Sequence, residues 1–168
     1  ANRANQILGK DRFHPIEDIN VYQSTNDTFP TAVTITLYRK LLDTEKLVIN
    51  LQETLIKKEN QFSKILMTGR TEMQDALPIT LGQVFASWAG MIERDRWRIH
   101  KLKERIRVIP LGGTAIGTGY PAPSIIVFAS EKFLREITTL PLSRSQNLPD
   151  EVANQDKWSE LASVIKII

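Results

Sequence analysis

The stretch QSTNDTFPTA, residues 23–32, is the starting point for predicting the fold of this chain. It holds four hydroxyl side chains, two amides and a carboxylate, and a long amphipathic segment follows it directly. Ser, Thr, Asn and Asp are the preferred N-cap residues, so composition alone favours a run that starts a helix. The same groups suit an anion, because the first-turn N–H groups of a helix are unpaired and its dipole is positive there.

A long helix is predicted directly after this run. Residues 28–64 place apolar side chains at three- and four-residue steps, which is the spacing of one helix face. Pro30 falls in the expected first turn, where its missing N–H costs no hydrogen bond. The apolar positions are Leu37, Leu41, Val48, Leu51, Leu55, Phe62 and Ile65.

A second long helix is predicted over residues 79–108, after a loop at 67–78. Pro78 is expected to open it, with Thr80 and Gln83 spaced as a capping box. Its rhythm suits antiparallel packing against the first helix. We therefore predict an all-α fold, in which long antiparallel helices form part of a helical bundle and the loops carry binding motifs.

The remainder of the chain is predicted to be shorter helices and loops, with no sheet. Residues 1–8 read as the end of a helix that Gly9 closes, and two further helices are expected at 122–138 and 149–168. Residues 111–119 contain four glycines, which indicates positive-φ turns or close backbone approach. Neither a Walker nor a dinucleotide-binding interpretation fits this loop, because it lacks a Gly-Lys-Ser/Thr ending and no strand pattern precedes it.

Composition narrows the class of protein. Hydrophobic residues make up 42% and charged residues 24% of the 168 residues, as in ordinary globular domains. The net charge of +3 is mild and its cations are mixed with carboxylates, which argues against a nucleic-acid surface. No apolar run is long enough to cross a bilayer, and no signal peptide is visible. The absence of cysteine removes disulfides and thiolate sites and is compatible with the cytoplasm, which is the predicted location.

Three motifs in order resemble the aspartase/fumarase superfamily, in particular aspartate ammonia-lyases and class II fumarate hydratases. The resemblance covers residues 1–120 well and the remainder loosely. Its motifs are Gln23–Asp27 with Phe29–Ala32, then Gly69–Thr71 with Gln74–Ala76 and Leu81–Gln83, and finally Gly112–Gly119.

The resemblance implies a homotetramer built through bundle helices, with active sites shared between subunits. It implies anti β-elimination from a four-carbon dicarboxylate, which yields fumarate and ammonia or water and needs no cofactor. Carried over by position, Ser24, Thr25 and Asn26 bind the substrate carboxylate and Thr71 is a second contributor. His14 marks a possible secondary carboxylate site, and no metal site is expected because the two histidines lie on separate elements.

Several residues depart from the family pattern. Glu72 stands where the family commonly has His, and a carboxylate there repels a dianion but pairs with an ammonium group, which favours aspartate. Ile16-Glu17 replaces Asn-Asp after His14-Pro15 and weakens that secondary site, and Tyr120-Pro121 replaces Leu-Asn after the glycine loop.

The resemblance also implies that the catalytic base lies beyond Ile168. We therefore expect a fragment that is inactive alone, with residues 1–25 as the end of an N-terminal helical region plus a polar loop. Residues 26–168 are expected to be a partial central bundle domain, truncated at both ends. Three functions stay open at this point: an aspartate ammonia-lyase, a fumarate hydratase and a non-catalytic helical scaffold.

Overall fold

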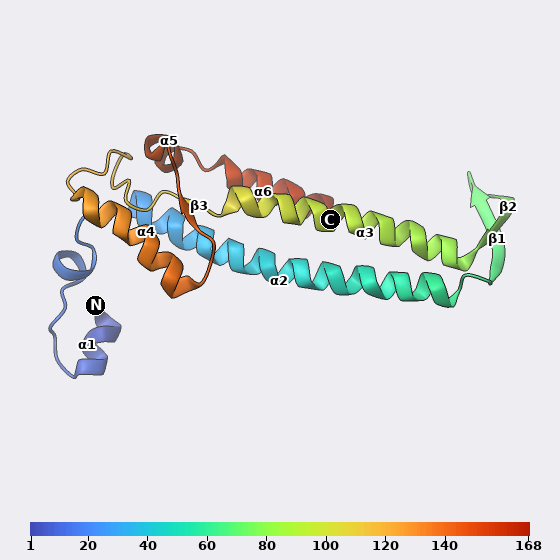
Figure 1. Ribbon diagram of the computed structural model, residues 1–168, viewed down its shortest axis with the longest axis horizontal. Helices are drawn as coiled ribbons and strands as arrows, with labels where there is room; N and C mark the ends of the chain where they lie inside the picture. Colours follow the sequence, from blue (N-terminus) through green and yellow to red (C-terminus); the bar gives the residue numbers. More distant parts are fainter. The chain divides into compact units, whose positions relative to one another are not determined.

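The computed structural model describes residues 1–168 and consists mainly of helices, which confirms the all-α prediction (Figure 1). The chain forms two compact units. The first contains Ala1–Leu37 and Arg105–Ser159, and the second contains Tyr38–Glu104 and Glu160–Ile168.

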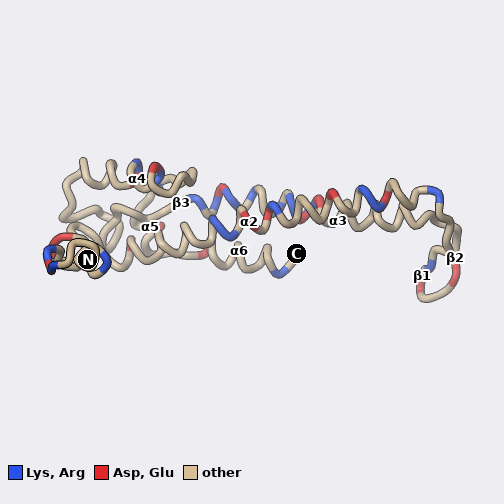
Figure 2. The backbone as a smooth tube through the Cα atoms, turned by 90° about the horizontal axis from the view of Figure 1, so that it is seen from below, with Lys and Arg blue, Asp and Glu red and all other residues tan.

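The second unit is built on two long antiparallel helices, as predicted. Helix α2 (Thr25–Gln61) contributes its turns from Tyr38 onward, and α3 (Leu81–Ile106) runs beside it (Figures 1 and 2). Contacts between them run in opposite directions along the chain. Phe62, which directly follows α2, meets Phe85 early in α3 with ring centroids 5.5 Å apart, and pairs between the two helices are Gln52 with Arg96 and Glu45 with Lys103.

The predicted apolar seam is buried only in part. Leu41, Val48, Ile99 and Leu102 are buried in the second unit, whereas Leu51 is 47% exposed. Larger exposed apolar side chains lie on the same two helices: Leu47, Trp88, Met91 and Trp97. Each long helix therefore presents more apolar surface than its neighbour in this chain covers.

The connection between α2 and α3 is a β-hairpin, so the prediction of a loop without a sheet was wrong. Strand β1 (Leu66–Thr71) pairs antiparallel with β2 (Gln74–Thr80). The turn residues Glu72 and Met73 have φ of 49° and 62°, the left-handed conformation that a tight hairpin turn requires. Polar residues are scattered through this segment, so apolar and polar side chains do not alternate as they do in a typical half-buried strand.

The start of α3 differs from the prediction in one respect. Pro78 lies within β2, opposite Thr68, rather than opening the helix. The capping box is confirmed: the Thr80 N–H donates to Gln83 Oε1 (2.9 Å) and the Gln83 N–H donates to Thr80 Oγ1 (3.1 Å). These paired bonds set the first helical residue at Leu81.

The first unit holds the start of α2 among short helices. It contains α1 (Asn2–Leu8), which Gly9 ends in the left-handed conformation as predicted, the short π-helix η1 (Pro15–Ile19) and α4 (Ser124–Thr138). A parallel pair, β3 (Val108–Ile109) with β4 (Ser143–Arg144), is a second departure from the prediction of no sheet. The buried apolar side chains of this unit are Ile106, Ile109, Leu111, Val127, Leu140, Leu142 and Leu148.

The single helix predicted at 149–168 is two helices, α5 (Leu148–Ala153) and α6 (Asp156–Ile167). Asn154 separates them in an extended conformation, and its side-chain amide donates to Asp150 Oδ1 (2.6 Å). Behind this break the buried Lys157 ammonium donates to the Val108 carbonyl oxygen (2.7 Å) and pairs with a carboxylate of α5. These long-range bonds of Lys157 have no local sequence signature.

Charges of both signs are distributed along the helices rather than gathered on one face (Figure 2). This agrees with the mixed pattern of the sequence and gives no extended basic stripe of the kind that binds nucleic acid. None of the helices combines the length and apolar character required to cross a bilayer.

Candidate functional site

Helix α2 begins at Thr25, three residues earlier than predicted, because Ser24 and Asp27 form a reciprocal cap. The Asn26 N–H donates to Ser24 Oγ (3.2 Å), and the Ser24 N–H donates to Asp27 Oδ1 (2.9 Å). The capping interpretation of residues 23–32 is thereby confirmed. Pro30 consequently lies in the second helical turn rather than the first, and since it has no N–H, the Asn26 carbonyl lacks its usual donor four residues along the helix.

Each of the three predicted binding residues keeps hydrogen-bonding capacity for a ligand. The Ser24 hydroxyl accepts a bond from Asn26, which leaves its own hydrogen to donate. Thr25 is exposed, and no hydrogen bond engages its hydroxyl. Asn26 donates through Nδ2 to the Ala115 carbonyl oxygen (2.7 Å), which orients the amide and leaves Oδ1 as an acceptor. The first-turn end of α2 adds partial positive charge beside these groups.

The glycine-rich loop 111–119 lies against this helix start. Asp27 is fully buried and its Oδ2 accepts from the Gly112 N–H (3.3 Å) and the Thr114 N–H (2.9 Å). The predicted positive-φ turns are present at Gly112 (φ 89°) and Gly117 (φ 86°). Asp27 lies three residues after Ser24, and this spacing is a sequence signal for its part in the cap. No such signal exists for its bonds to a loop more than 80 residues away, and sequence reasoning missed them.

Thr71 and Glu72 belong to the second unit, at the tip of the hairpin. Thr71 is the last residue of β1, and both side chains are exposed. An exposed ion pair between Arg70 Nε and Asp75 Oδ1 (2.9 Å) connects the strands next to them. In sequence, most of α2 and strand β1 lie between Ser24, Thr25 and Asn26 and the hairpin tip that carries Thr71 and Glu72.

His14 caps the short helix η1 rather than lying free in a loop. The ring Nδ1 accepts from the Glu17 main-chain N–H (3.2 Å), and the main-chain N–H of His14 donates to Asp18 Oδ2 (2.7 Å). The ring is exposed, and the Asp18 carboxylate bonded to the His14 main chain disfavours an anion there. His14 as a secondary carboxylate site remains a prediction.

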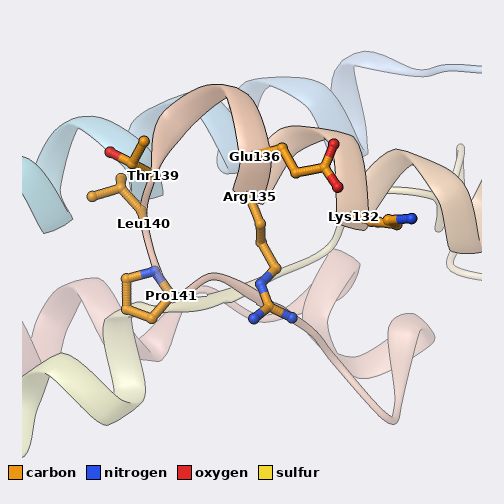
Figure 3. Close-up of a pocket in the computed structure, with 6 residues that line it drawn as sticks. All are labelled: Lys132, Arg135, Glu136, Thr139, Leu140 and Pro141. Carbon is orange, nitrogen blue, oxygen red and sulfur yellow. The ribbon is translucent and has the colours of Figure 1, made fainter.

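A surface pocket of about 550 Å³ in the first unit has no predicted site residue in its lining. Figure 3 shows the side chains of Lys132, Arg135 and Glu136 projecting from α4, with Pro141 in the segment that follows. Charges of both signs line this pocket. No group of three or more His, Asp or Glu side chains in the chain is arranged to hold a metal ion.

Comparison with known proteins places this arrangement in a family. The family model described as "Lyase" matches residues 1–168. Aspartate ammonia-lyase of Bacillus sp. is 35% identical over 175 residues, which cover 99% of this chain and 37% of that protein. A class II fumarate hydratase of Helicobacter pylori (strain J99) is 41% identical over 147 residues, which cover 82% of this chain and 30% of that protein.

A solved structure shows the same fold. The fumarate lyase:delta crystallin from Brucella melitensis, determined bound to cobalt, superposes with a TM-score of 0.89 and is 32% identical. The match covers 99% of this chain and 37% of that one. The chain therefore spans about one third of the length of these relatives. From the family match over its whole length and this shared helical fold, we conclude that the chain belongs to the aspartase/fumarase superfamily of lyases.

Proposed function

We propose that the protein to which this chain belongs removes ammonia from L-aspartate by anti β-elimination and forms fumarate. The observation that carries the proposal is the cluster of Ser24, Thr25 and Asn26 at the start of α2, in a chain that matches the lyase family throughout. Two hydroxyl donors and an oriented amide at a positive helix end suit a substrate carboxylate.

The chemistry explains why these groups are neutral. A base removes the C3 proton, and the adjacent carboxylate then carries a second negative charge in the transition state. Donors aimed at that developing charge stabilise it more than they stabilise the substrate, which is what accelerates the reaction. Ser24 and Thr25 can supply such donors, because the Ser24 hydroxyl hydrogen and the Thr25 hydroxyl have no partner in the fold.

Two features bear on the choice of substrate. Asn26 keeps Oδ1 free to accept a hydrogen bond, since its nitrogen is held by Ala115. Glu72 has an exposed carboxylate, which attracts the ammonium group of aspartate. Malate has an uncharged hydroxyl in place of that ammonium group. Only the Glu72 charge distinguishes the two substrates, because Asn26 Oδ1 can also accept a hydrogen bond from the malate hydroxyl, and this charge favours aspartate over malate.

Fumarate hydration is the second candidate, and the 41% identity to a Helicobacter pylori fumarate hydratase favours it. For either reaction we place the catalytic base beyond Ile168, so residues 1–168 alone are expected to be inactive. A non-catalytic scaffold remains the third candidate, and it predicts an inactive full-length protein.

Fumarate formation by the full-length protein tests these functions. The absorbance of fumarate is followed with L-aspartate and with L-malate as substrates. A higher kcat/KM for aspartate supports the proposal, a higher value for malate supports hydratase activity, and no fumarate from either contradicts both.

Substitutions of two different threonines test the proposed binding site. We expect Thr25→Ala to lower kcat by a factor on the order of 10², the typical effect of removing one donor to a developing charge. Thr36→Ala is the matched control, because Thr36 is another exposed threonine of α2 whose hydroxyl only donates to the Ala32 carbonyl within the helix (3.0 Å). Equal effects of the two substitutions would argue against a binding role for Thr25.

A further inference from the structure

Asp27 connects two segments that are distant in sequence. Its carboxylate is fully buried and accepts three main-chain bonds: Oδ1 from the Ser24 N–H (2.9 Å), and Oδ2 from the N–H groups of Gly112 (3.3 Å) and Thr114 (2.9 Å). One oxygen completes the cap of α2, and the other holds the glycine-rich loop. The side chain itself has no surface from which to contact a substrate.

The chemistry of these partners requires a carboxylate. All three are N–H donors, and a carboxylate offers only acceptor positions. An asparagine of the same shape has one oxygen and one NH₂ group, so either Ser24 or the loop pair would face a donor instead of an acceptor. Bonds from N–H groups to a charged acceptor are also stronger than neutral ones.

The loop backbone depends on this attachment. Thr114 has φ of 58°, a left-handed conformation that is unfavourable for a residue with a Cβ. Such residues persist only where their surroundings hold them. The Thr114 N–H bond to Asp27 is one such restraint, and the Thr114 hydroxyl, 2.7 Å from the carbonyl oxygens of Gly113 and Tyr120, is another.

The same loop also orients a predicted binding residue. Asn26 donates through Nδ2 to the Ala115 carbonyl oxygen, one residue beyond Thr114. The direction of the Asn26 amide therefore depends on where the loop lies, and the loop position depends on Asp27. Movement of the loop would turn the Asn26 amide and loosen the cap that orients the Ser24 hydroxyl.

We propose that Asp27 is a positioning residue, which locks the glycine-rich loop to the start of α2 so that Ser24 and Asn26 present fixed hydrogen-bonding groups to the substrate. The inference rests on the proposed function for its substrate, and on the geometry alone for the coupling of the two segments.

The main test is Asp27→Asn in the full-length protein, studied at a temperature where circular dichroism shows both proteins folded. Amide hydrogen exchange at Gly112 and Thr114 reports the coupling, and we expect it to be at least about tenfold faster in the variant because a charged hydrogen-bond acceptor is lost. Isothermal titration with succinate, a dicarboxylate that cannot eliminate, reports the site, and we expect its Kd to rise about tenfold for the same reason.

Thr34→Val is the matched control. Thr34 is another buried polar residue of α2, and its hydroxyl has no hydrogen-bond partner. This substitution should leave both exchange and succinate affinity unchanged. A purely structural role of Asp27 predicts a lower Tm with unchanged succinate affinity of the folded protein, and that result would overturn the proposal.

Thr114→Gly provides a second route if Asp27→Asn does not fold. It keeps the N–H bond to Asp27 and all predicted binding residues but removes the hydroxyl restraint and frees the backbone. Weaker succinate binding supports the coupling, and unchanged binding contradicts it. A wild-type protein that neither forms fumarate nor binds succinate overturns the proposed function and the substrate part of this inference. Amide hydrogen exchange then still tests whether Asp27 couples the loop to the start of α2.

Discussion

Glu72 is the residue at which this chain departs most clearly from the pattern it resembles. It occupies the hairpin turn with φ of 49°, beside Met73 at φ of 62°, and its side chain is exposed. The position therefore places no packing demand on the side chain, and a carboxylate there is free to act through its charge.

Glu72→Gln in the full-length protein tests this charge. We expect the ratio of kcat/KM for aspartate to that for malate to fall roughly tenfold or more, because a charged hydrogen-bond partner of an ammonium group contributes about 1.5–3 kcal/mol. The measurement is fumarate formation from each substrate.

Met73→Gln is the control for that experiment. Met73 is 94% exposed in the same turn with a similar backbone conformation, and its replacement removes no charge. An unchanged substrate ratio in Glu72→Gln would exclude a role for this carboxylate in substrate choice.

The glycine-rich loop packs its backbone closely against neighbouring elements. A Cβ on Gly117 would lie 2.3 Å from both the Cα and the N of Pro149, at the start of α5. A Cβ on Gly112 would lie 2.8 Å from Cγ1 of Val127 in α4. The loop therefore packs its backbone directly against two helices, which only residues without a side chain permit.

Two glycine substitutions distinguish the energetic cost of an unfavourable backbone conformation from the cost of close packing. Gly9→Ala and Gly117→Ala both place alanine at positive φ, 66° and 86°, but nothing lies within 4 Å of a Cβ on Gly9. We expect Gly9→Ala to lower the free energy of unfolding by about 1–2 kcal/mol through conformation alone. Gly117→Ala should cost at least about 2 kcal/mol more, because the backbone of Pro149 must move.

Urea denaturation of the two variants, in the full-length protein, provides the measurement. Equal losses of stability would mean that the loop yields to the added methyl group, and the close approach to α5 would then not constrain it.

At the scale of the whole molecule, the long helices carry apolar surface that this chain leaves uncovered. Leu47 is 69% exposed on α2, and Trp97 is 50% exposed on α3. Water-exposed side chains of this size on several consecutive turns are typical of helices that pack against further helices. We propose that they do so in a homotetramer built through the bundle helices.

Leu47→Glu tests this assembly. Leu47 contributes little to the packing of its own unit, so the substitution should leave the helices folded. It should introduce a charge into the interface between subunits, which weakens association by about 2 kcal/mol or more per contact. Light scattering of the full-length protein should then show smaller assemblies than the wild type.

Lys46→Glu is the control, because it introduces the same side chain at an exposed polar position in the same turn. Unchanged assembly in both variants would contradict a role for this face in association.

The sequence was sufficient for features with a local cause. Amphipathic spacing predicted the two long helices, the Thr80–Gln83 capping box predicted the start of α3, and Gly9 predicted the end of α1. The order of the motifs was sufficient for the family. All of these signals lie within a few residues of the structure they specify, or in residue identities that do not depend on packing.

Features that depend on distant partners were not accessible in this way. The break between α5 and α6 at Asn154 lies close to Lys157, whose ammonium binds the distant Val108 carbonyl oxygen. The hairpin at residues 66–80 is local, and it was missed for a different reason, because its strands have no alternating pattern. The cap at Asp27 was foreseeable because Ser24 is three residues away. Its second oxygen binds Gly112 and Thr114, and only the folded chain brings that loop to the start of α2. Local hydrogen bonding thus explains what sequence alone revealed, while contacts between remote segments account for what required the tertiary structure.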